Sequence, residues 1–316
     1  MTAANKKIRQ QFADTMLAVG QADERLVVLI GDISHGILQP FAKACAGRFY
    51  NVGICEPTIV NMAAGLAKVG FHPVVHTIAP FIVERSFEQI KLDFGYQQLG
   101  VNLVTVGSAF DYGQLGCTHH CYDDFALLKN IPRSQILYPA SALEFDCLFR
   151  QTYDNGLVSY FRVPEATHGV SFTADQVSVG QGILVGEGRD VTIVAVGSQL
   201  HSVLGAVPQL AERGISVEVV YLHTIKPLDR ELIRHSVIKT KRCLVVEEHG
   251  PFGGVFDDVL RATRDLSGIR YQALNIGERF VHEYGTYEQL CAQLGLSADG
   301  VISHTAVLME TDKVYA

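Results

Sequence analysis

Glu56 is the acidic residue whose surroundings point most directly to chemistry. It lies in YNVGICEPTIVNMAAGLAKVG, where a predicted strand ends and a predicted helix begins. Ligands of open α/β folds bind at the carboxyl ends of the strands, so this carboxylate would face a binding crevice. Helix capping is the alternative, because an acidic residue near a helix N-terminus contributes about 0.3–1 kcal/mol. Position alone leaves both interpretations open.

An aromatic residue and a long loop with histidines follow in the chain. Phe81 comes directly after Pro80, in the loop that leaves the next predicted strand, and could stack on a flat heterocycle or pack in the core. The loop that begins at residue 107 contains His119 and His120, and long loops of this kind are often functional. Adjacent histidines rarely point at one metal ion. Hydrogen bonding or proton exchange with a substrate hydroxyl is the better interpretation for them.

Composition limits the classes of function that need considering. The chain has 316 residues, of which 48% are hydrophobic and 19% charged, and these proportions are typical of a globular protein. A net charge of −7 argues against binding to nucleic acid backbones, which requires a basic surface. The seven cysteines form no CxxC pair, and no segment resembles a signal peptide or a membrane span. We therefore expect a cytoplasmic protein without a membrane or nucleic acid partner.

Short apolar runs alternate with amphipathic segments, and this pattern predicts parallel sheets with crossover helices. In the first half, the predicted strands are 26–30, 48–53, 72–79, 101–107 and 157–163, and the predicted helices are 6–22, 56–70 and 84–97. A turn-rich linker is predicted over 164–181. In the second half, the predicted strands are 190–198, 215–222 and 243–250, and helices are predicted at 200–214, near 229–238 and after 252–254. We expect two α/β domains, over residues 1–170 and 185–316.

Several motifs, taken together and in order, resemble a known family. GICEP, APF followed by RSFEQIK, GCTHH, NIPRSQILYPAS and SYFRVPE are similar to the pyrimidine-binding domain of transketolases. EGRDVTIVAVGS, AERGISVEVVYLHTIKPLD, VVEEHGPFGG and GERFVHEYGTYEQL are similar to the C-terminal domain of the same family. The likeness extends from about residue 6 to about residue 310. It implies a thiamine-diphosphate-binding α/β fold, with a parallel sheet and flanking helices, followed by a smaller α/β domain.

The resemblance also implies roles for individual residues. The reaction would be transfer of a two-carbon ketol unit from a ketose, expected to be phosphorylated, to an aldehyde, with thiamine diphosphate as cofactor. Catalytic roles would fall to Glu56 and His119. For the cofactor, the resemblance implies that Glu56 contacts the aminopyrimidine, that Phe81 stacks on the same ring, and that Asp32 and Ile54 line its pocket. For the substrate, it implies that His119 contacts hydroxyls and that Arg162 binds a phosphate.

Two departures from the family pattern bear on the substrate. Leu115 occupies the place of an acidic residue in GQLGCTH, and Gly107 and Ser108 stand where a substrate-contacting histidine is expected. Both leave the identity of the sugar open, including whether it carries a phosphate.

The diphosphate half of a complete site is not recognisable in this sequence. The family holds Mg²⁺ and the diphosphate with a GDG motif and a downstream Asn, whereas here Gly31-Asp32 is followed by Ile33, and Asn51 is too near. Mg²⁺ requires fixed oxygen ligands, so these groups are hard to replace. We expect an alpha-type partner subunit with the GDG motif to supply the Mg²⁺ ligands, in an α2β2 assembly.

Other functions remain to be distinguished. The beta subunit of a 2-oxo acid dehydrogenase shares the two-domain plan and the dependence on a partner, although the THH loop and LHTIKPLD look more like transketolase. A 1-deoxyxylulose-phosphate-synthase-like activity is less favoured, because that enzyme carries both cofactor domains on one chain. A non-catalytic subunit with the same fold is the third alternative. Retention of Glu56, Phe81 and His119 together argues against it.

Overall fold

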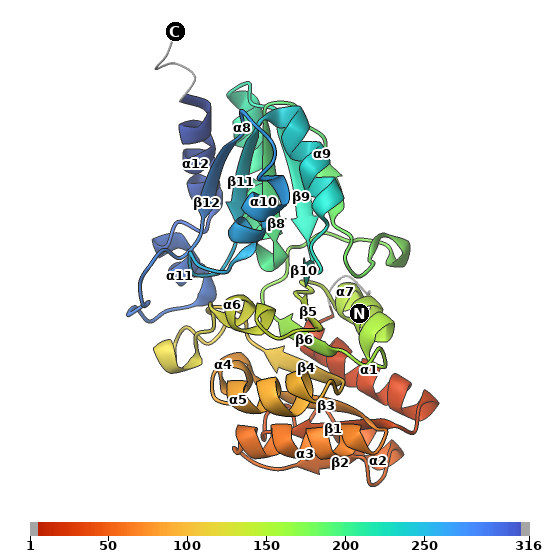
Figure 1. Ribbon diagram of the computed structural model, residues 1–316. Coiled ribbons are helices and arrows are strands. Elements are labelled where there is room, and N and C mark those ends of the chain that lie inside the picture. Colours follow the sequence, from red (N-terminus) through yellow and green to blue (C-terminus); the bar gives the residue numbers. More distant parts are fainter. Residues whose placement is uncertain (1–5, 311–316) are drawn as a thin grey trace.

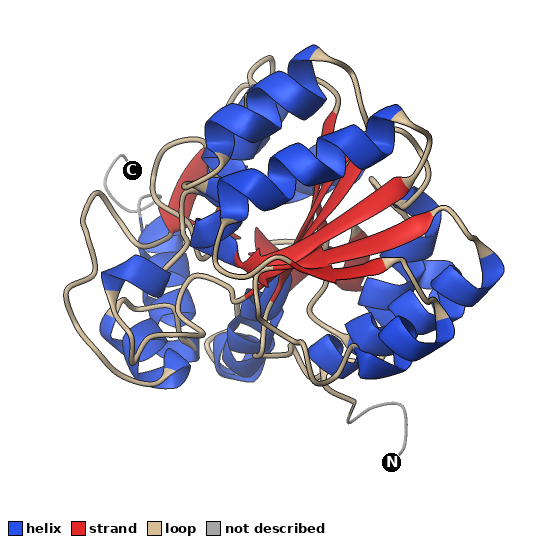
Figure 2. Ribbon diagram, turned by 90° about the horizontal axis from the view of Figure 1, so that it is seen from below, coloured by secondary structure: helices blue, strands red, loops and turns tan. Residues whose placement is uncertain are grey.

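Two β-sheets with helices packed against them make up the computed structural model, which describes residues 6–310. Figure 1 shows the first sheet in the lower part of the molecule and the second above it. Helices lie on both faces of the strands, as Figure 2 shows. This arrangement confirms the predicted two-domain α/β fold. Within residues 6–310, no helix is both long and apolar enough to cross a membrane.

The first sheet has seven strands in the order β10-β5-β6-β4-β3-β1-β2. Six of them come from the first half of the chain and run parallel to one another: β1 (Leu26–Ile30), β2 (Phe49–Asn51), β3 (His72–Ile78), β4 (Val101–Val106), β5 (Ser134–Leu137) and β6 (Val158–Val163). The α-helices of this half are α1 (Ile8–Ala22), α2 (Gln39–Ala44), α3 (Glu56–Lys68), α4 (Ala79–Val83), α5 (Phe87–Gln89), α6 (Asp124–Lys129) and α7 (Ala142–Thr152).

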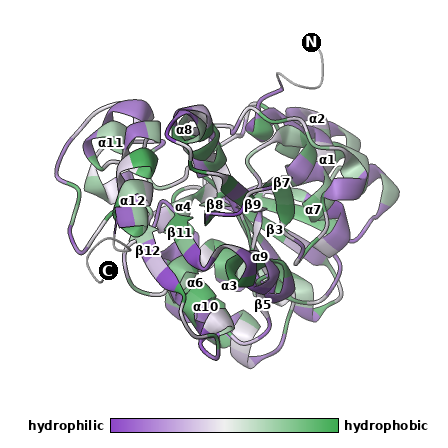
Figure 3. Ribbon diagram, turned by 90° about the horizontal axis from the view of Figure 1, so that it is seen from above, coloured by the Kyte–Doolittle hydropathy of each residue, from purple (hydrophilic) through white to green (hydrophobic). Residues whose placement is uncertain are grey.

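The second sheet has five strands in the order β12-β11-β8-β9-β7, in which only β7 is antiparallel to its neighbour. Its strands are β7 (Ile183–Gly186), β8 (Val191–Val196), β9 (Val217–Leu222), β11 (Arg242–Val246) and β12 (Arg270–Leu274). The helices around it are α8 (Leu200–Glu212), α9 (Arg230–Thr240), α10 (Val255–Thr263), α11 (Tyr287–Gln293) and α12 (Ala298–Glu310). Figure 3 shows hydrophilic and hydrophobic residues alternating around these outer helices.

Burial on both faces explains the bare apolar runs of the central strands. Every residue of β1, β4, β6, β8 and β9 is buried, and parallel sheets covered by helices require such continuous runs. The predicted helix over 84–97 is not a single α-helix. It consists of α5 and a π-helical segment, Ile90–Tyr96. The predicted linker contains one 3₁₀ turn, Ala174–Gln176.

One strand from the second half of the chain joins the first sheet. β10 (Thr224–Lys226) pairs antiparallel with β5, and Thr224 lies opposite Leu137. The backbone NH of Tyr138 also donates to the carbonyl of His223 over 2.8 Å. Buried side chains of both halves form one hydrophobic cluster around this junction, with members that include Val27, Ile136, Ile225 and Val245. The two sheets are therefore joined by backbone pairing and by a shared core.

Candidate active site

Glu56 is buried at the first residue of α3, shortly beyond the end of β2. Its side chain is 2% exposed, and Pro57 occupies the first turn of the helix, where a missing NH costs nothing. Oε2 accepts a hydrogen bond from Nη1 of Arg85 at 3.0 Å. Oε1 is buried and has no hydrogen-bond partner among residues 6–310. A buried carboxylate oxygen without a partner is costly, so this atom is suited to a ligand that can donate a proton to it.

Phe81 and His119 lie beside the same arginine. The guanidinium of Arg85 stacks over the ring of Phe81, with its central carbon 3.9 Å from the ring centroid. The ring of His119 meets the edge of Phe81 with a centroid separation of 5.1 Å. Three of the residues predicted from the sequence thus gather around Arg85, from α3, α4 and the 3₁₀ turn Cys117–His119. A carboxylate, an aromatic face and an imidazole are brought together here.

The two adjacent histidines have different surroundings. His119 is partly exposed, and its Nδ1 lies 2.9 Å from the hydroxyl of Thr118. His120 is buried and packs against the rings of Phe110 and Tyr122. Burial lowers the pKa of His119, and the charge of Arg85 lowers it further. An imidazole can accept or donate a proton only where a ligand can reach it, and of these two histidines His119 is the more accessible.

Asp32 and Ile54 are both exposed. Asp32 has a positive φ of 67°, its NH donates to Oδ1 of Asn51 at 3.1 Å, and its own Oδ1 accepts from the amide of Asn51 at 3.2 Å. Its hydrogen bonds therefore go to Asn51 and not to Glu56. Ile54 is 69% exposed, two residues before Glu56. A single exposed apolar side chain is common at protein surfaces, so its exposure assigns Ile54 no role by itself.

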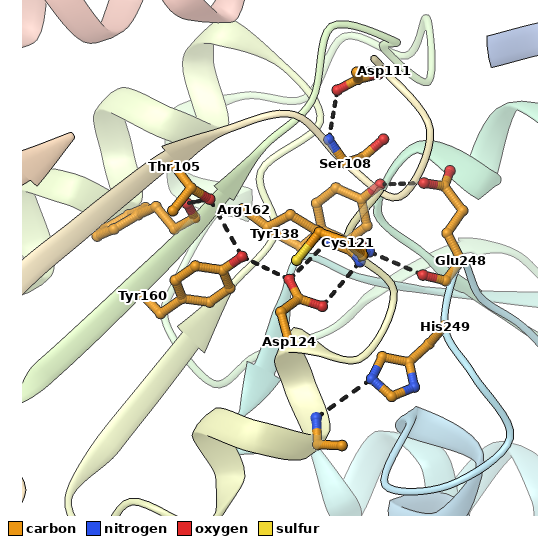
Figure 4. A network of polar contacts seen from close by, with 12 residues as sticks. Thr105, Ser108, Asp111, Cys121, Asp124, Tyr138, Tyr160, Arg162, Glu248 and His249 are labelled. Carbon is orange, nitrogen blue, oxygen red and sulfur yellow. Dashed lines mark hydrogen bonds and ion pairs between the residues drawn. The ribbon is translucent and has the colours of Figure 1, made fainter. Parts of the chain in front are cut away.

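Arg162 does not lie where a substrate could reach it, and here the structure corrects the sequence-based expectation. Its side chain in β6 is fully buried, at the centre of the polar network in Figure 4. Asp124 pairs with it through Nε at 2.9 Å and through Nη2 at 2.9 Å. The remaining contacts of the guanidinium are the carbonyls of Glu248 at 3.1 Å and of Cys121. Buried and held by these contacts, Arg162 joins the two halves of the chain and is not placed to bind a phosphate.

A different arginine lines an open pocket next to Asp32. The pocket measures about 630 Å³, and its walls include Lys7, Arg9, Asp32, Ser34, His35 and Glu165. Arg9 donates from Nε to the hydroxyl of Ser34 at 2.8 Å, and its two terminal nitrogens have no partner among residues 6–310. Arg9 in the first turn of an amphipathic helix looks like an ordinary surface residue in the sequence, so no pattern indicated it.

Buried His76 fixes the orientation of the Ser34 hydroxyl. Nδ1 of His76 lies 2.7 Å from the carbonyl of Val104 and therefore donates, so Nε2, 2.7 Å from Ser34 Oγ, must accept. Burial lowers the pKa of His76 to about 3, and the imidazole is neutral at physiological pH. Ser34 itself has a positive φ of 64°. Backbone strain at Asp32 and Ser34, on the same short loop, is typical of a functional site.

Both halves of the chain match domains of known proteins. The family model of the transketolase pyrimidine binding domain matches residues 4–168, and that of the transketolase C-terminal domain matches residues 180–301. The B subunit of the apulose-4-phosphate transketolase of Phocaeicola vulgatus is 33% identical over 297 residues, which cover 93% of this chain and 94% of that protein. The 1-deoxy-D-xylulose-5-phosphate synthase of Heliobacterium modesticaldum is 33% identical over 311 residues. The matched region is 96% of this chain and 47% of that synthase, so the chain spans about half the synthase's length.

Two solved structures share the fold. One, described as a split gene transketolase in an inactive beta4 tetramer, superposes with a TM-score of 0.85 at 29% identity, covering 96% of this chain and 97% of the other. A transketolase mutant from Pichia stipitis superposes with a TM-score of 0.77 at 16% identity, covering 97% of this chain and 46% of the other. The second likeness concerns the fold alone.

Proposed function

Because this chain belongs to the transketolase family, we propose that it is the beta-type subunit of a two-component, thiamine diphosphate-dependent transketolase. It would transfer a two-carbon ketol unit from a ketose to an aldehyde. The observation that carries the proposal is the buried Glu56, whose Oε1 lacks a partner within residues 6–310 and whose ion-pair partner Arg85 stacks on the ring of Phe81. Glu56 and Phe81 fit an aminopyrimidine, which offers a flat ring to stack and a nitrogen that can share a proton.

The chain's own residues account for binding and proton handling. When bound, thiamine diphosphate supplies the nucleophilic carbon and the electron sink for cleavage next to a carbonyl. Glu56 would hold a proton on the pyrimidine ring through Oε1, and Phe81 would fix the plane of the ring. His119 would exchange protons with, or hydrogen-bond to, the hydroxyls of the sugar. Arg85 pairs with Glu56 and covers Phe81, so a ring stacking on that face would have to move it.

An anionic group on the substrate has a candidate binding residue in Arg9. Its terminal nitrogens suit a phosphate, because the planar fork of arginine can donate two parallel hydrogen bonds. Lys7 adds positive charge to the same pocket, whereas Asp32 and Glu165 favour a ligand that also carries hydroxyls. A relative named for apulose-4-phosphate supports a phosphorylated ketose as the substrate class.

A partner subunit is part of the proposal. It would carry the GDG motif and the Mg²⁺ ligands, and two copies of each chain would form an α2β2 assembly, in the cytoplasm. The relative described as an inactive beta4 tetramer is a split-gene transketolase, which fits a beta chain that needs an alpha chain for activity. Permanent interfaces of this kind bury about 2,000–5,000 Å².

Reconstitution with the alpha-type subunit tests the proposal. We expect the mixture to bind thiamine diphosphate with Mg²⁺ and to transfer ketol units from ketose phosphates, and we expect this chain alone to do neither. Glu56→Gln in the mixture should lower turnover by about 10²–10⁴-fold, the usual cost of losing an acid–base group. Glu24→Gln, at an exposed position before β1 and so at the opposite edge of the parallel sheet from Glu56, is the matched control and should have normal turnover.

Three outcomes would contradict the proposal. The first is near-normal turnover of Glu56→Gln, and the second is tight cofactor binding with turnover by this chain alone. The third is a mixture that acts on pyruvate and a lipoyl domain but not on ketose phosphates, since that would make the enzyme a 2-oxo acid dehydrogenase.

A further inference from the structure

The loop that carries His119 is anchored in the second half of the molecule. It leaves β4, and its residues Ala109 and Phe110 are fully buried. They belong to the hydrophobic cluster of the second sheet, together with Val191 and Leu290. The start of the loop is therefore held by the domain that does not contain Glu56 or Phe81.

Hydrogen bonds attach the same loop to the second half at further points. The NH of Gly250 donates to the carbonyl of Tyr122 at 2.8 Å, and the NH of Val281 donates to the hydroxyl of Tyr122 at 3.3 Å. Nearer the histidine, the NH of Gly285 donates to the carbonyl of Gly113 at 3.3 Å. The segment 281–285 thus runs along the loop on both sides of the His119 turn.

Gly116 lies in close contact with the ring of Tyr284. A Cβ atom placed on Gly116 would lie 2.6 Å from Cε1 of Tyr284, so the ring rests directly on the backbone. The carbonyl of Gly116 accepts the NH of His119 at 2.9 Å, and this bond closes the 3₁₀ turn that presents the imidazole. Tyr284 is 70% exposed, so burial of its own surface does not explain why it lies there.

We propose that Tyr284 is a positioning residue, which holds the Gly116–His119 turn so that the imidazole faces the ligand site next to Phe81. The second domain would thereby control the substrate contact of the first. This inference rests on the proposed function, because it assumes that His119 contacts the substrate. Small displacements of a positioned group are costly, since an error of about 1 Å can lower a rate by about 100-fold.

Substitutions at Tyr284 in the reconstituted enzyme test the proposal. Tyr284→Ala should lower kcat/KM for the ketose by about 10–100-fold and leave thiamine diphosphate binding unchanged, because Glu56 and Phe81 are untouched. Tyr284→Phe keeps the ring and should restore most of the activity. Phe280→Ala, which removes an aromatic side chain of almost equal exposure (69%) from the position just before this segment, is the matched control and should behave like the wild type.

A double-mutant cycle with His119→Ala separates this inference from the proposed function. If Tyr284 acts through His119, Tyr284→Ala should cost little once the imidazole is gone. Should the two losses in kcat/KM simply multiply, or should Tyr284→Ala have no effect on its own, the positioning role is wrong. Should His119→Ala itself leave kcat/KM unchanged, it is the assigned role of His119 that fails.

Gly116→Ala gives a second, independent test. Alanine there meets two obstacles, a positive φ of 77° and the ring of Tyr284. Gly214 has the same φ of 77° with open space around a built Cβ, so Gly214→Ala measures the strain without the clash. We expect Gly116→Ala to lose more activity than Gly214→Ala and to regain part of it when combined with Tyr284→Ala. Equal behaviour of the two glycine variants would contradict the proposed contact.

Discussion

Arg9 and Arg162 show that residue type alone does not predict whether an arginine can bind a ligand, because its hydrogen-bond partners decide this. Arg162 is fully buried and enclosed by Asp124, two backbone carbonyls and the rings of Phe125 and Tyr138, so a ligand has no access to its guanidinium. Arg9 uses one nitrogen on Ser34 and keeps the other two at the wall of a pocket. Of the two, only Arg9 can meet an anion without dismantling the structure.

Arg9→Ala should therefore weaken binding of phosphorylated substrates selectively. A hydrogen bond to a charged group contributes about 1.5–3 kcal/mol, which corresponds to a rise in KM for a ketose phosphate of about 10–100-fold. The KM of the corresponding sugar without phosphate should change much less. Steady-state kinetics with both sugars measure the difference, and Arg25→Ala, which removes an arginine paired with Asp23 at the surface, is the control. An equal rise for both sugars would show that Arg9 does not bind the phosphate.

At the scale of the element, Asp111 ties the beginning of the histidine loop to the beginning of the linker. Its Oδ2 accepts the NH of Ser108 at 2.6 Å and the NH of Glu165 at 2.9 Å. Burial raises the pKa of Asp111 to about 7, and the charge of Glu248 adds a smaller increase. The two hydrogen bonds lower the pKa but do not offset the effect of burial. The loop is thus held by a buried carboxyl group whose ionisation is unfavourable.

Replacing this group by an amide should change how stability depends on pH. The folded pKa of Asp111 is raised above its unfolded value of 3.8, so its stabilising contribution is complete below about pH 4 and is lost as pH rises to about 7. Asp111→Asn removes that loss. The difference in free energy of unfolding, variant minus wild type, should rise by up to about 1.4 kcal/mol per pH unit between about pH 4 and pH 7. Above pH 7 this difference should stay constant.

Urea unfolding at pH 5, 6, 7 and 8.5 measures the gain, and other titrating groups such as His76 cancel in the comparison of the two proteins. Gln97→Ala, which removes an exposed side chain that does not titrate, should show no such trend. A difference between Asp111→Asn and the wild type that is constant with pH would mean that Asp111 is not protonated more readily in the folded protein.

Most elements could be predicted from the sequence, because their patterns are local. The apolar run of β1 and the helix α3, with Pro57 in its first turn and Gly70 after its end, follow from burial and from backbone preferences. The gathering of Glu56, Phe81 and His119 was also accessible, since all three follow strands of one parallel sheet and its carboxyl ends share an edge.

The remaining features depend on contacts between distant segments, which no local pattern records. β10 is only three residues long, too short for a recognisable pattern, and its partner β5 lies almost 90 residues earlier in the chain. The burial of Arg162 results from Asp124 and Glu248, which approach it from two other segments. Nothing in the spacing of α1 distinguishes Arg9 from its exposed neighbours, because its partner Ser34 lies beyond the next strand.

For the molecule as a whole, the shared core determines how the chain unfolds. Ile225 of β10 is 1% exposed, and it belongs to the cluster that contains Ile136 from the first half and Val245 from the second. Residues that pack in one cluster lose their contacts together. The two sheets should therefore unfold as one cooperative unit, even though family models match the two halves separately.

Calorimetry of Ile225→Ala tests this expectation. Truncating a buried Ile to Ala costs about 2–5 kcal/mol, so the variant should unfold at a lower temperature and still in a single transition. Ile238→Ala, at a position that is 45% exposed, should have almost no effect. Two separate transitions, of which only one moves in Ile225→Ala, would show that the halves unfold independently.

The pairing of β10 with β5 also limits how this protein can shield its reaction from water. Many two-domain enzymes do so by rotating one domain towards the other about a hinge. A rotation here would break the β10–β5 hydrogen bonds and expose the side chains around Ile225. Rigid-body closure within this chain is therefore not available, and exclusion of solvent must come from a local rearrangement of the 107–123 loop or from the surface of another subunit.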